Sequence, residues 1–415
     1  MTFSINLTDE EKQIVDDLAS GKLSFRKADS VSENPERAAL LRRLALEKMK
    51  NTDLSDLSYF SFDCSQVSKK NIENLVGAVQ VPLGIAGPLS ISGEFAKGEY
   101  HIPLATTEGA LVASVNRGCS AITKSGGTTV RIFKNMMTRA PLFKLKSVGE
   151  AHRFYNWLTL PETFEKIKTV AENTTRFGKL HSAEPFISGT SVHLRLGFDT
   201  KDAMGMNMIT IATEAVTQMI EKETGISCLT LSGNMCTDKK PTALNAALGR
   251  GKTVVAETLI PKEIIEQTFK CTADSMFQVN YEKNLLGTIR AGGLGFNAHA
   301  ANIVAALFIA CGQDPAHVVE GSLTITQMDL TEDGGLLCTV TMPAVEVGTI
   351  GGGTSISSQK ACLSILGVSG SSEIPGENSS KLSEIVAASV LAGEISLIGA
   401  QAAGHLARAH ATLGR

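Results

Sequence analysis

A run of small polar residues from Ser232 to Pro241 ends in two adjacent lysines and is well suited to chemistry. The next segment, Thr242 to Gly249, has a helical pattern, and proline is favoured at the first position of a helix. Lys239 and Lys240 are therefore expected just before a helix N-terminus, where their charges and the helix dipole act on the same small volume. Such a place can hold an anion or a developing oxyanion. A capped surface loop with solvated lysines is the alternative.

Glu108 lies among small apolar residues in the segment from Thr106 to Ala113. A carboxyl group in apolar surroundings holds its proton more firmly, whereas a helix N-terminus favours the ionised form. If desolvation dominates, Glu108 can donate a proton to a reacting group. A capping role at the start of a helix is the alternative.

Asp314 and two histidines are further candidates. Asp314 follows an apolar helical segment, which is typical of an acid in a helix-ending turn, so it gains a chemical role only if the fold brings it to Lys239 and Glu108. His405 and His410 lie in the last helical segment, about 140° apart around the helix axis. They cannot share a metal ion as an i, i+4 pair does. One core histidine and one surface histidine is the simpler interpretation.

Two glycine-rich segments could bind phosphate. Gly293 to Ala298 fits the loose dinucleotide pattern GxGxx(G/A), and Glu320 follows at about the distance of the usual acidic residue. No clear strand precedes Gly293, so we interpret this match as coincidental. The triplet from Gly351 to Gly353 could let a phosphate approach the backbone, but alone it indicates only a tight turn.

The composition is that of a globular protein. The 415 residues include 43% hydrophobic and 20% charged residues, with a formal net charge of −3, which argues against binding of nucleic acid or anionic membranes. None of the eight cysteines forms a CxxC pair, so we expect reduced, buried thiols and no metal site. The N-terminus lacks a signal-peptide pattern, and the apolar run from Ile303 to Cys311 is too short to span a membrane. These features predict a cytoplasmic protein.

The elements that must position these residues mix helices and strands. Residues 8–50 have a helical pattern that Pro35 interrupts, and residues 75–91 indicate a strand–turn–strand entry to a new domain. Residues 128–230 alternate short β-rich runs with helical ones. The remaining signals are a long helical segment from Thr106 to Gly126, strands within 321–347 and a long, buried apolar helix over 381–413.

Together these segments resemble the 3-hydroxy-3-methylglutaryl-CoA (HMG-CoA) reductase family over roughly residues 70–415. The residues of Ser232–Pro241 and of Gly351–Gly353 resemble those of the class I branch of the family (eukaryotic and archaeal type) rather than those of the class II branch. The matching stretches are Glu73–Gly77, Thr106–Gly118, Asp202–Asn207, Ser232–Pro241, Asn297–Asn302, Gly312–Asp314 and Leu391–Glu394 with the residues through His410.

The resemblance implies an α+β fold. A large domain would be built around a long central helix starting near Thr106, with an inserted ferredoxin-like, non-Rossmann cofactor domain and a small helical N-terminal domain. The site would form at a homodimer interface near Glu73 and Asn74, and pairing of dimers into a tetramer stays open. The implied domains are 1–75 (N-terminal), 76–139 with 231–415 (substrate and CoA), 140–230 (inserted, NADP-binding) and a C-terminal flap at about 393–415.

The resemblance also implies an activity and residue roles. HMG-CoA would be reduced to mevalonate and free CoA by two NADPH, through thiohemiacetal and aldehyde intermediates, in the mevalonate pathway of isoprenoid biosynthesis. Lys239 would stabilise the developing oxyanion, Glu108 would donate a proton to the carbonyl, and Asp314 would lie between them. His410, rather than His405, would protonate the departing CoA thiolate.

Binding roles follow from the same resemblance. Arg176 would meet the 2′-phosphate, which favours NADPH, and no metal is implied. Substrate contacts are implied for Arg139, Ser232, Lys240, Lys283, Asn302, Glu73 and Asn74. Cofactor contacts are implied for Thr175, Arg176, Phe177, Asp202, Met204, Gly205, Met206, Asn207, Gly351, Gly352 and Gly353.

Some positions depart from the family. Arg290 replaces a usually apolar residue, one residue is missing near Gly295, and Thr175 stands where serine is common. Because the chain ends at Arg415, we do not expect the phosphorylatable serine of the regulated animal enzymes.

Three other interpretations stay open. A Rossmann-type dehydrogenase would need a strand before Gly293. A non-catalytic CoA-binding protein of the same fold would not need the four catalytic candidates intact. Lys239 could also form a Schiff base, which would give the purified protein a cofactor absorbance band.

Overall fold

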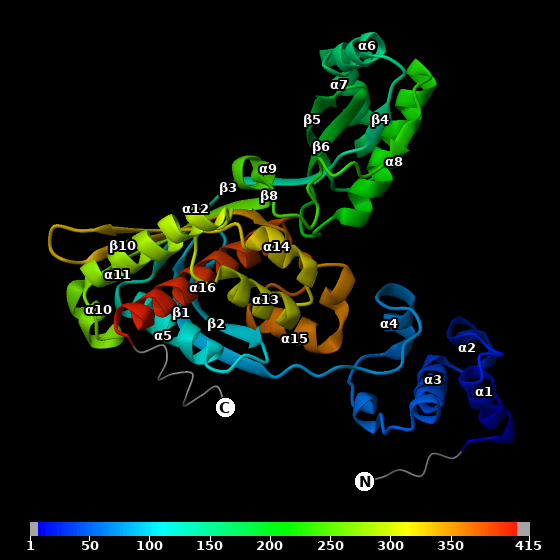
Figure 1. Cartoon of the computed structure of the whole chain (residues 1–415), viewed down its shortest axis with the longest axis horizontal. Helices are drawn as coiled ribbons and strands as arrows, with labels where there is room; N and C mark the ends of the chain where they lie inside the picture. Colours follow the sequence, from blue (N-terminus) through cyan, green and yellow to red (C-terminus); the bar gives the residue numbers. More distant parts are fainter. Residues whose placement is uncertain (1–6, 405–415) are drawn as a thin grey trace. The chain divides into compact units, whose positions relative to one another are not determined.

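The structure is a computed structural model that describes residues 7–404, and the chain forms two compact units (Figure 1). One unit comprises residues 1–82 and 355–361, and the other comprises residues 83–354 and 362–415, each within the described range.

The first unit is helical. Thr8 and Glu11 form a capping box at the start of its first helix, and the Asn34 side chain caps the helix that begins at Pro35. The apolar faces of these helices meet around buried residues such as Leu41. The helices are α1 (Asp9–Ala19), α2 (Ala28–Val31), α3 (Pro35–Lys50) and α4 (Cys64–Lys70).

The second unit contains a ten-stranded, mainly antiparallel sheet. Its main path is β7-β4-β6-β3-β8-β10-β9; β1 pairs with β3 in parallel, β2 pairs with β1, and β5 pairs with β6. The α+β prediction is thereby confirmed at the level of a mixed fold with an antiparallel sheet. The strands are β1 (Leu83–Ser92), β2 (Lys97–Ala105), β3 (Thr128–Arg139), β4 (Leu142–Lys144), β5 (Lys179–Ser188), β6 (Ser191–Asp199), β7 (Cys228–Thr230), β8 (Arg250–Ile260), β9 (Ile325–Leu330) and β10 (Leu336–Val345).

Helix α16 (Glu377–Ala402) runs through the core of the second unit (Figure 1). It is long and apolar enough to cross a membrane, but 83% of its most apolar window is buried inside the protein, as in the core helix of a globular fold. It packs against α5 (Leu111–Lys124) so closely that a Cβ on Gly118 would lie 1.9 Å from the carbonyl oxygen of Ala392.

The expected helix start near Thr106 is wrong by one turn. Ala110 has φ 70°, in the left-handed region, so the segment before it is a turn and α5 begins only at Leu111. At 26 residues, α16 is longer than α5 with 14. Glu108 therefore lies in the turn before a helix.

Residues between β4 and β7 have a hydrophobic core of their own. Helices α6 (Val148–Leu158), α7 (Pro161–Glu172) and α8 (Met206–Thr224) pack with strands β4 to β6 around buried Phe143 and Val216 (Figure 1). Gly205, with φ 95°, is the N-cap of α8. This turn is the kind of conformation for which glycine is suited.

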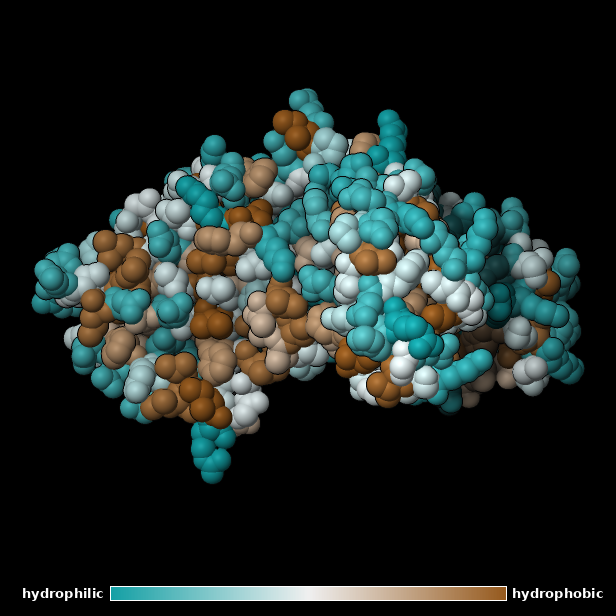
Figure 2. Space-filling model, turned by 90° about the horizontal axis from the view of Figure 1, so that it is seen from above, coloured by the Kyte–Doolittle hydropathy of each residue, from teal (hydrophilic) through white to brown (hydrophobic). Residues whose placement is uncertain are grey.

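The second unit contains further helices. Figure 2 shows one face on which hydrophilic and hydrophobic side chains are interspersed, with hydrophobic groups gathered in places. Exposed apolar residues of this unit include Phe133, Leu229 and Ile289. These helices are α9 (Ala243–Leu248), α10 (Lys262–Phe269), α11 (Ala273–Val279), a π-helix (Asn280–Gly287), α12 (Thr288–Ala291), α13 (Ala300–Ala310), α14 (Val318–Gly321) and α15 (Ser357–Ile365), whose first residues belong to the first unit.

Candidate active site

Lys239 and Asp314, which are far apart in the sequence, form an ion pair. Lys239 Nζ lies 2.8 Å from Asp314 Oδ2. The hydrogen bond to Asp314 raises the pKa of Lys239. Burial would raise the pKa of Asp314, but the hydrogen bonds from Lys239 and the Ala316 N–H lower it. Both groups are therefore charged at neutral pH, which disfavours a Schiff-base role because that role needs a neutral amine.

The backbone around Lys239 has an unusual conformation. Thr237 and Lys239 have φ 61° and 56°, in the left-handed region that non-glycine residues rarely adopt. Asn245 in α9 holds this turn, since its side-chain amide donates to Thr237 O (3.0 Å) and Lys240 O (3.1 Å). Thr242, not Pro241, caps α9, so the expectation of proline at the first helical position is wrong by two residues.

A turn after α13 positions Asp314. Gly312, with φ 65°, turns the chain after α13, and Asp314 follows two residues later. Asp314 Oδ1 accepts a hydrogen bond from Ala316 N–H (3.0 Å), while Oδ2 faces Lys239. The turn-capping role expected from sequence and the pairing with Lys239 therefore coexist in one carboxylate.

Glu108 is exposed, so the expected burial by its small neighbours is wrong for this chain. Its backbone N–H is bound by Thr106 Oγ1 (3.0 Å), and Asn302 Nδ2 donates to Glu108 Oε1 over 3.4 Å. Asn302 lies in the first turn of α13, whose C-terminal end leads to Asp314. Within residues 7–404, Glu108 is thus bonded to Asn302 and makes no direct hydrogen bond to Lys239.

Glu394 is a supporting residue to which the sequence analysis gave no role. Its buried carboxylate accepts hydrogen bonds from the N–H groups of Ala298 and His299 and from Thr326 Oγ1, each at 2.7 Å. Because Ala298 and His299 lie at the start of α13 and Thr326 lies on β9, Glu394 fixes the segment that carries Asn302 and ties it to the sheet. An acid within the apolar pattern of α16 was the available signal, and Glu384 gives the same signal.

The other predicted substrate residues of the second unit lie near this loop or on the π-helix. Ser232 Oγ lies 3.2 Å from Cys236 Sγ, and Lys240 Nζ donates to Asp238 O over 3.2 Å. Lys283 Nζ donates to Asn284 Oδ1 over 2.7 Å, and burial lowers the pKa of Lys283. Arg139 is the last residue of β3, and its neighbour Ala140 forms a β-bridge with Ser232.

Two predicted cofactor stretches lie side by side. Ala203 forms a parallel β-bridge with Ile350, and Thr349 N–H donates to Asp202 O over 2.8 Å. These contacts bring Asp202 and the segment through Met204, Gly205, Met206 and Asn207 next to Gly351, Gly352 and Gly353. The Asp202 carboxylate accepts from Ser372 Oγ (2.7 Å) and Ser379 N–H (3.1 Å), so it fixes this loop.

The third predicted cofactor stretch meets the first turn of α8. Thr175 Oγ1 lies 3.0 Å from Met208 Sδ. The Arg176 guanidinium carbon lies 5.0 Å from the centre of the Phe177 ring, within the range of a cation–π contact. Thr175, Arg176 and Phe177 therefore lie near the start of α8.

The Rossmann interpretation is wrong. Helix α12 and a turn, not a strand, precede Gly293. Asn297 donates hydrogen bonds to the carbonyl oxygens of Ser322 (2.9 Å) and Thr324 (2.8 Å), so the segment is part of the internal packing.

Two candidates belong to the first unit, and two lie outside the described residues. Glu73 and Asn74 are exposed residues of the first unit, where Asn74 has φ 53°. His405 and His410, with most of the expected C-terminal flap, lie outside the described residues.

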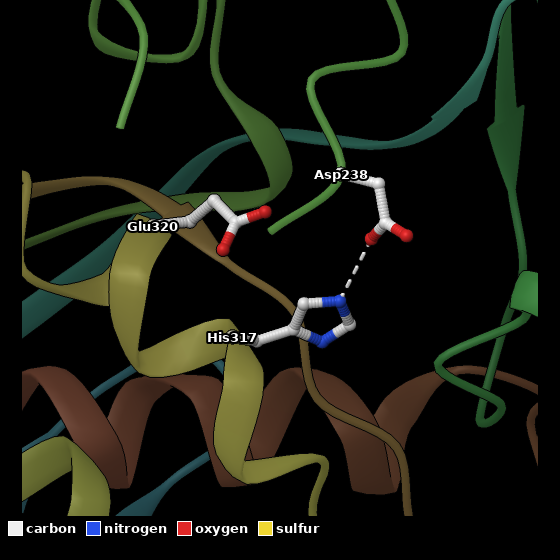
Figure 3. Close-up of side chains that lie close together, drawn as sticks. All are labelled: Asp238, His317 and Glu320. Atoms are coloured by element: carbon white, nitrogen blue, oxygen red, sulfur yellow. Dashed lines mark hydrogen bonds and ion pairs between the residues drawn. The ribbon is translucent and has the colours of Figure 1, made fainter. Parts of the chain in front are cut away.

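Asp238, His317 and Glu320 form a cluster whose ligand-type atoms all lie within 4.8 Å of one another, a spacing that could surround a metal ion (Figure 3). Figure 3 shows His317 directed at Asp238, with 3.0 Å between Nε2 and Oδ1. Arg250 pairs with both acids, at 3.0 Å from Asp238 and 3.3 Å from Glu320. Because a guanidinium already supplies positive charge here, we interpret the cluster as a buried charge network.

The chain is similar to known proteins over nearly its whole length. Residues 38–415 match the family model described as hydroxymethylglutaryl-coenzyme A reductase. Relatives named 3-hydroxy-3-methylglutaryl-coenzyme A reductase include that of Pyrococcus horikoshii (49% identity, 99% of both chains) and that of Methanocaldococcus jannaschii (52% identity, 91% of this chain and 93% of the relative). A solved class II reductase from Streptococcus pneumoniae, bound to NADPH in open conformations, has a TM-score of 0.66 at 18% identity, covering 92% of this chain and 98% of that one. At this identity the likeness concerns the fold alone.

Proposed function

Since the chain belongs to the hydroxymethylglutaryl-coenzyme A reductase family, we propose that it reduces (S)-HMG-CoA to (R)-mevalonate and free CoA with two NADPH. This reaction is a step of the mevalonate pathway of isoprenoid biosynthesis. The observation that carries the proposal is the Lys239–Asp314 ion pair beside the glycine turn at residues 351–353. Conversion of a thioester to an alcohol needs two hydride transfers, so the cofactor is exchanged between them.

Lys239 stabilises the oxygen on which negative charge develops in each reduction. A preorganised donor of this kind is typically worth about 2.7–4 kcal/mol of transition-state stabilisation. Asp314 keeps the lysine charged and directed, since the two groups are 2.8 Å apart. On the family resemblance we assign to Glu108, which Asn302 contacts, the role of supplying a proton to the carbonyl oxygen.

His410 protonates the departing CoA thiolate, which makes it a better leaving group. We assign this role on the family resemblance, and the residue belongs to the proposed flap at about 393–415. Closure of such a flap would keep the aldehyde intermediate in the site while one cofactor leaves and the next binds.

The substrate's carboxylate and hydroxyl groups would be held by cationic and polar groups from several elements. Lys240 and Ser232 come from the Lys239 loop, and Arg139 comes from the end of β3. Lys283 on the π-helix and Asn302 on α13 complete the set within the second unit. Substrate contacts of Glu73 and Asn74 are proposed on the family resemblance alone.

The residues present fit a nicotinamide dinucleotide, which supplies the hydride when bound. Gly205 leaves the first N–H groups of α8 without a side-chain cap, and a helix N-terminus favours a phosphate. Cβ atoms added to Gly351 or Gly352 would meet nothing within 4 Å, so this turn has open space beside it. Arg176 is the proposed partner of the 2′-phosphate.

The proposal also covers the class of the enzyme, its oligomeric state, its compartment and its domains. Identities of 44–52% to relatives from archaea and from Hevea brasiliensis, against 18–20% to the Streptococcus structures, favour a class I-like enzyme. Exposed apolar residues such as Phe133 support association with a second subunit. On the family resemblance we propose a homodimer with the site at its interface, and we propose a cytoplasmic protein. We also propose residues 140–230 as the ferredoxin-like cofactor domain, 76–139 with 231–415 as the substrate domain and 1–75 as the N-terminal domain.

The test is oxidation of NADPH, and separately of NADH, in the presence of HMG-CoA by the wild type and by Lys239→Ala. We expect two NADPH consumed per CoA released, and loss of turnover in the variant. Turnover with NADH alone would contradict the role of Arg176. A folded wild type without turnover on either cofactor would contradict the reductase and favour a CoA-binding protein.

A further inference from the structure

A buried charge network lies directly behind Lys239. The Arg250 side chain is 0% exposed, and its guanidinium contacts three carboxylates: Asp238 (3.0 Å), Glu320 (3.3 Å) and Glu346 (3.2 Å). His317, also buried, shares the Asp238 Oδ1 atom with Arg250, at 3.0 Å from Nε2. Buried charges are stable only when paired in this way.

The network contacts the Lys239 loop at two points. Asp238 precedes Lys239 in the chain, and the Glu320 carboxylate accepts a hydrogen bond from the Lys239 backbone N–H. Arg250 contacts both Asp238 and Glu320, so one guanidinium bridges the two groups that fix the lysine backbone. This backbone is in the left-handed region at Lys239, a conformation that persists only when its surroundings over-determine it.

The charges of the network do not balance if every acid is ionised and the histidine is neutral. Burial raises the pKa of Glu346 to about 7. Burial alone would lower the pKa of His317, but the hydrogen bond with Asp238 and the charge of Glu346 raise it. The groups that act on His317 come from the Lys239 loop, β8, α14 and the chain after β10, and they are Asp238, Arg250, Glu320 and Glu346.

We infer that Arg250 and His317 are positioning residues that hold Lys239 through Asp238 and Glu320, and that the charge on His317 tunes the Lys239–Asp314 pair. This inference rests on the proposed function, in which Lys239 acts on the developing oxyanion. Neither residue touches the reacting atoms. Loss of either changes the alignment of Lys239 in the transition state more than substrate binding, so it lowers kcat more than it raises KM.

The test compares His317→Gln and His317→Leu with the wild type from pH 6 to pH 9. Glutamine can still donate a hydrogen bond to Asp238 but cannot carry the charge, whereas leucine does neither. We expect His317→Gln to have about tenfold lower kcat at pH 6 and to approach the wild type at pH 9. His317→Leu should lose between about tenfold and a hundredfold at every pH, because a misaligned catalytic group commonly has such an effect.

Arg250→Lys examines the other half of the inference, since lysine keeps the charge but lacks the planar fork of donors with which the guanidinium contacts three acids. We expect at least about a tenfold loss of kcat with KM within about twofold of the wild type. If this variant does not fold, the His317 pair decides the matter. His152→Gln, in exposed α6, is the matched control and should have the wild-type profile.

A readout that does not depend on turnover separates this inference from the proposed function. The Lys239 backbone amide resonance, assigned by its loss in Lys239→Ala, should titrate with pH in the wild type. The titration should be smaller in His317→Gln, where Glu346, with a pKa of about 7, still titrates. Suppose that the wild type is active and that both His317 variants have its pH profile of kcat and its Lys239 resonance. This result would overturn the inference. An inactive wild type would contradict the reductase, and the resonance would still decide the coupling.

Discussion

Gly312 and Gly353 touch through their backbones, and this contact joins the turn that carries Asp314 to the glycine turn proposed for the cofactor. A Cβ added to Gly312 would lie 2.4 Å from the carbonyl oxygen of Gly353, closer than real Cβ contacts. Gly312 also has φ 65°, where an L side chain is strained. The proposed cofactor turn and Asp314 are therefore fixed relative to each other.

Gly312→Ala should accordingly destabilise the protein and abolish most of its activity. Left-handed backbone alone costs about 1–2 kcal/mol for alanine, and the clash should add about 1–3 kcal/mol. Urea unfolding measures the stability, and NADPH oxidation measures the activity. Gly292→Ala is the control, because Gly292 has φ 73° with nothing within 4 Å of the added Cβ. Equal losses of stability in the two variants would show that the contact is unimportant.

In Asp314→Asn, activity should be lost at a lower alkaline pH than in the wild type. The hydrogen bond to Asp314 raises the pKa of Lys239, so the wild-type lysine keeps its proton to a higher pH than an isolated lysine. In the variant the alkaline limb of kcat should move to lower pH, with kcat reduced by about tenfold or more even at neutral pH. The pH–rate profiles of the two proteins provide the measurement. An unmoved alkaline limb would mean that Asp314 does not control the protonation of Lys239.

Glu346 should make the folded protein less stable as the pH rises from about 4.5 to about 7. Burial raises its pKa in the folded state to about 7, so between these values the unfolded chain has released a proton that the folded chain still holds. Stability is then greatest below the unfolded pKa and falls until the folded carboxyl ionises, by roughly 3 kcal/mol in total.

Glu346→Gln removes this titration while keeping the shape of the side chain. Urea unfolding should therefore show that the free energy of unfolding of the wild type is lower at pH 7.5 than at pH 5. In the variant this decrease should be much smaller. His317 contributes to both proteins in the same direction, since its raised pKa also makes stability fall with rising pH. An equal loss of stability in the two proteins would show that a group other than Glu346 titrates in this pH range.

The sequence singled out Lys239 as a candidate, but it did not predict the residues that surround this lysine. Paired lysines before a short helix are visible in the chain, and the α16 pattern predicted a long buried helix that the structure contains. The ion pair with Asp314 required the fold, because 75 residues of sequence separate partners that are 2.8 Å apart in space. Their pairing depends on how the turn after α13 is packed.

The predictions from sequence were wrong where local backbone geometry or burial determines the structure. The left-handed Ala110 delays α5, and it places Glu108 in an exposed turn that its apolar neighbours did not predict. Arg250 has no local signal of burial, since it stands between two glycines at the start of β8. Its role depends on three acids from three other parts of the chain, which no sequence window contains.

Two buried glutamates on α16 allow an effect on the reaction to be distinguished from an effect on the stability of the fold. Glu384 and Glu394 each accept three hydrogen bonds, and Glu384 binds the N–H groups of the β1–β2 turn, whereas Glu394 binds the start of α13. Replacing either by glutamine turns an amide NH₂ toward groups that also donate. Each variant should therefore lose about 2–4 kcal/mol of stability, because a buried donor is left unpaired.

Only Glu394→Gln should also impair the reaction, since α13 carries Asn302 and leads to Asp314. At a temperature where both variants are folded, we expect kcat/KM to fall about tenfold or more for Glu394→Gln and less than about twofold for Glu384→Gln. Thermal unfolding and steady-state kinetics on the same samples provide both quantities. If the two variants lose activity equally, the effect of Glu394 reflects general loosening of α16. If only Glu394→Gln loses activity, the start of α13 is the connection between this buried acid and the reacting groups.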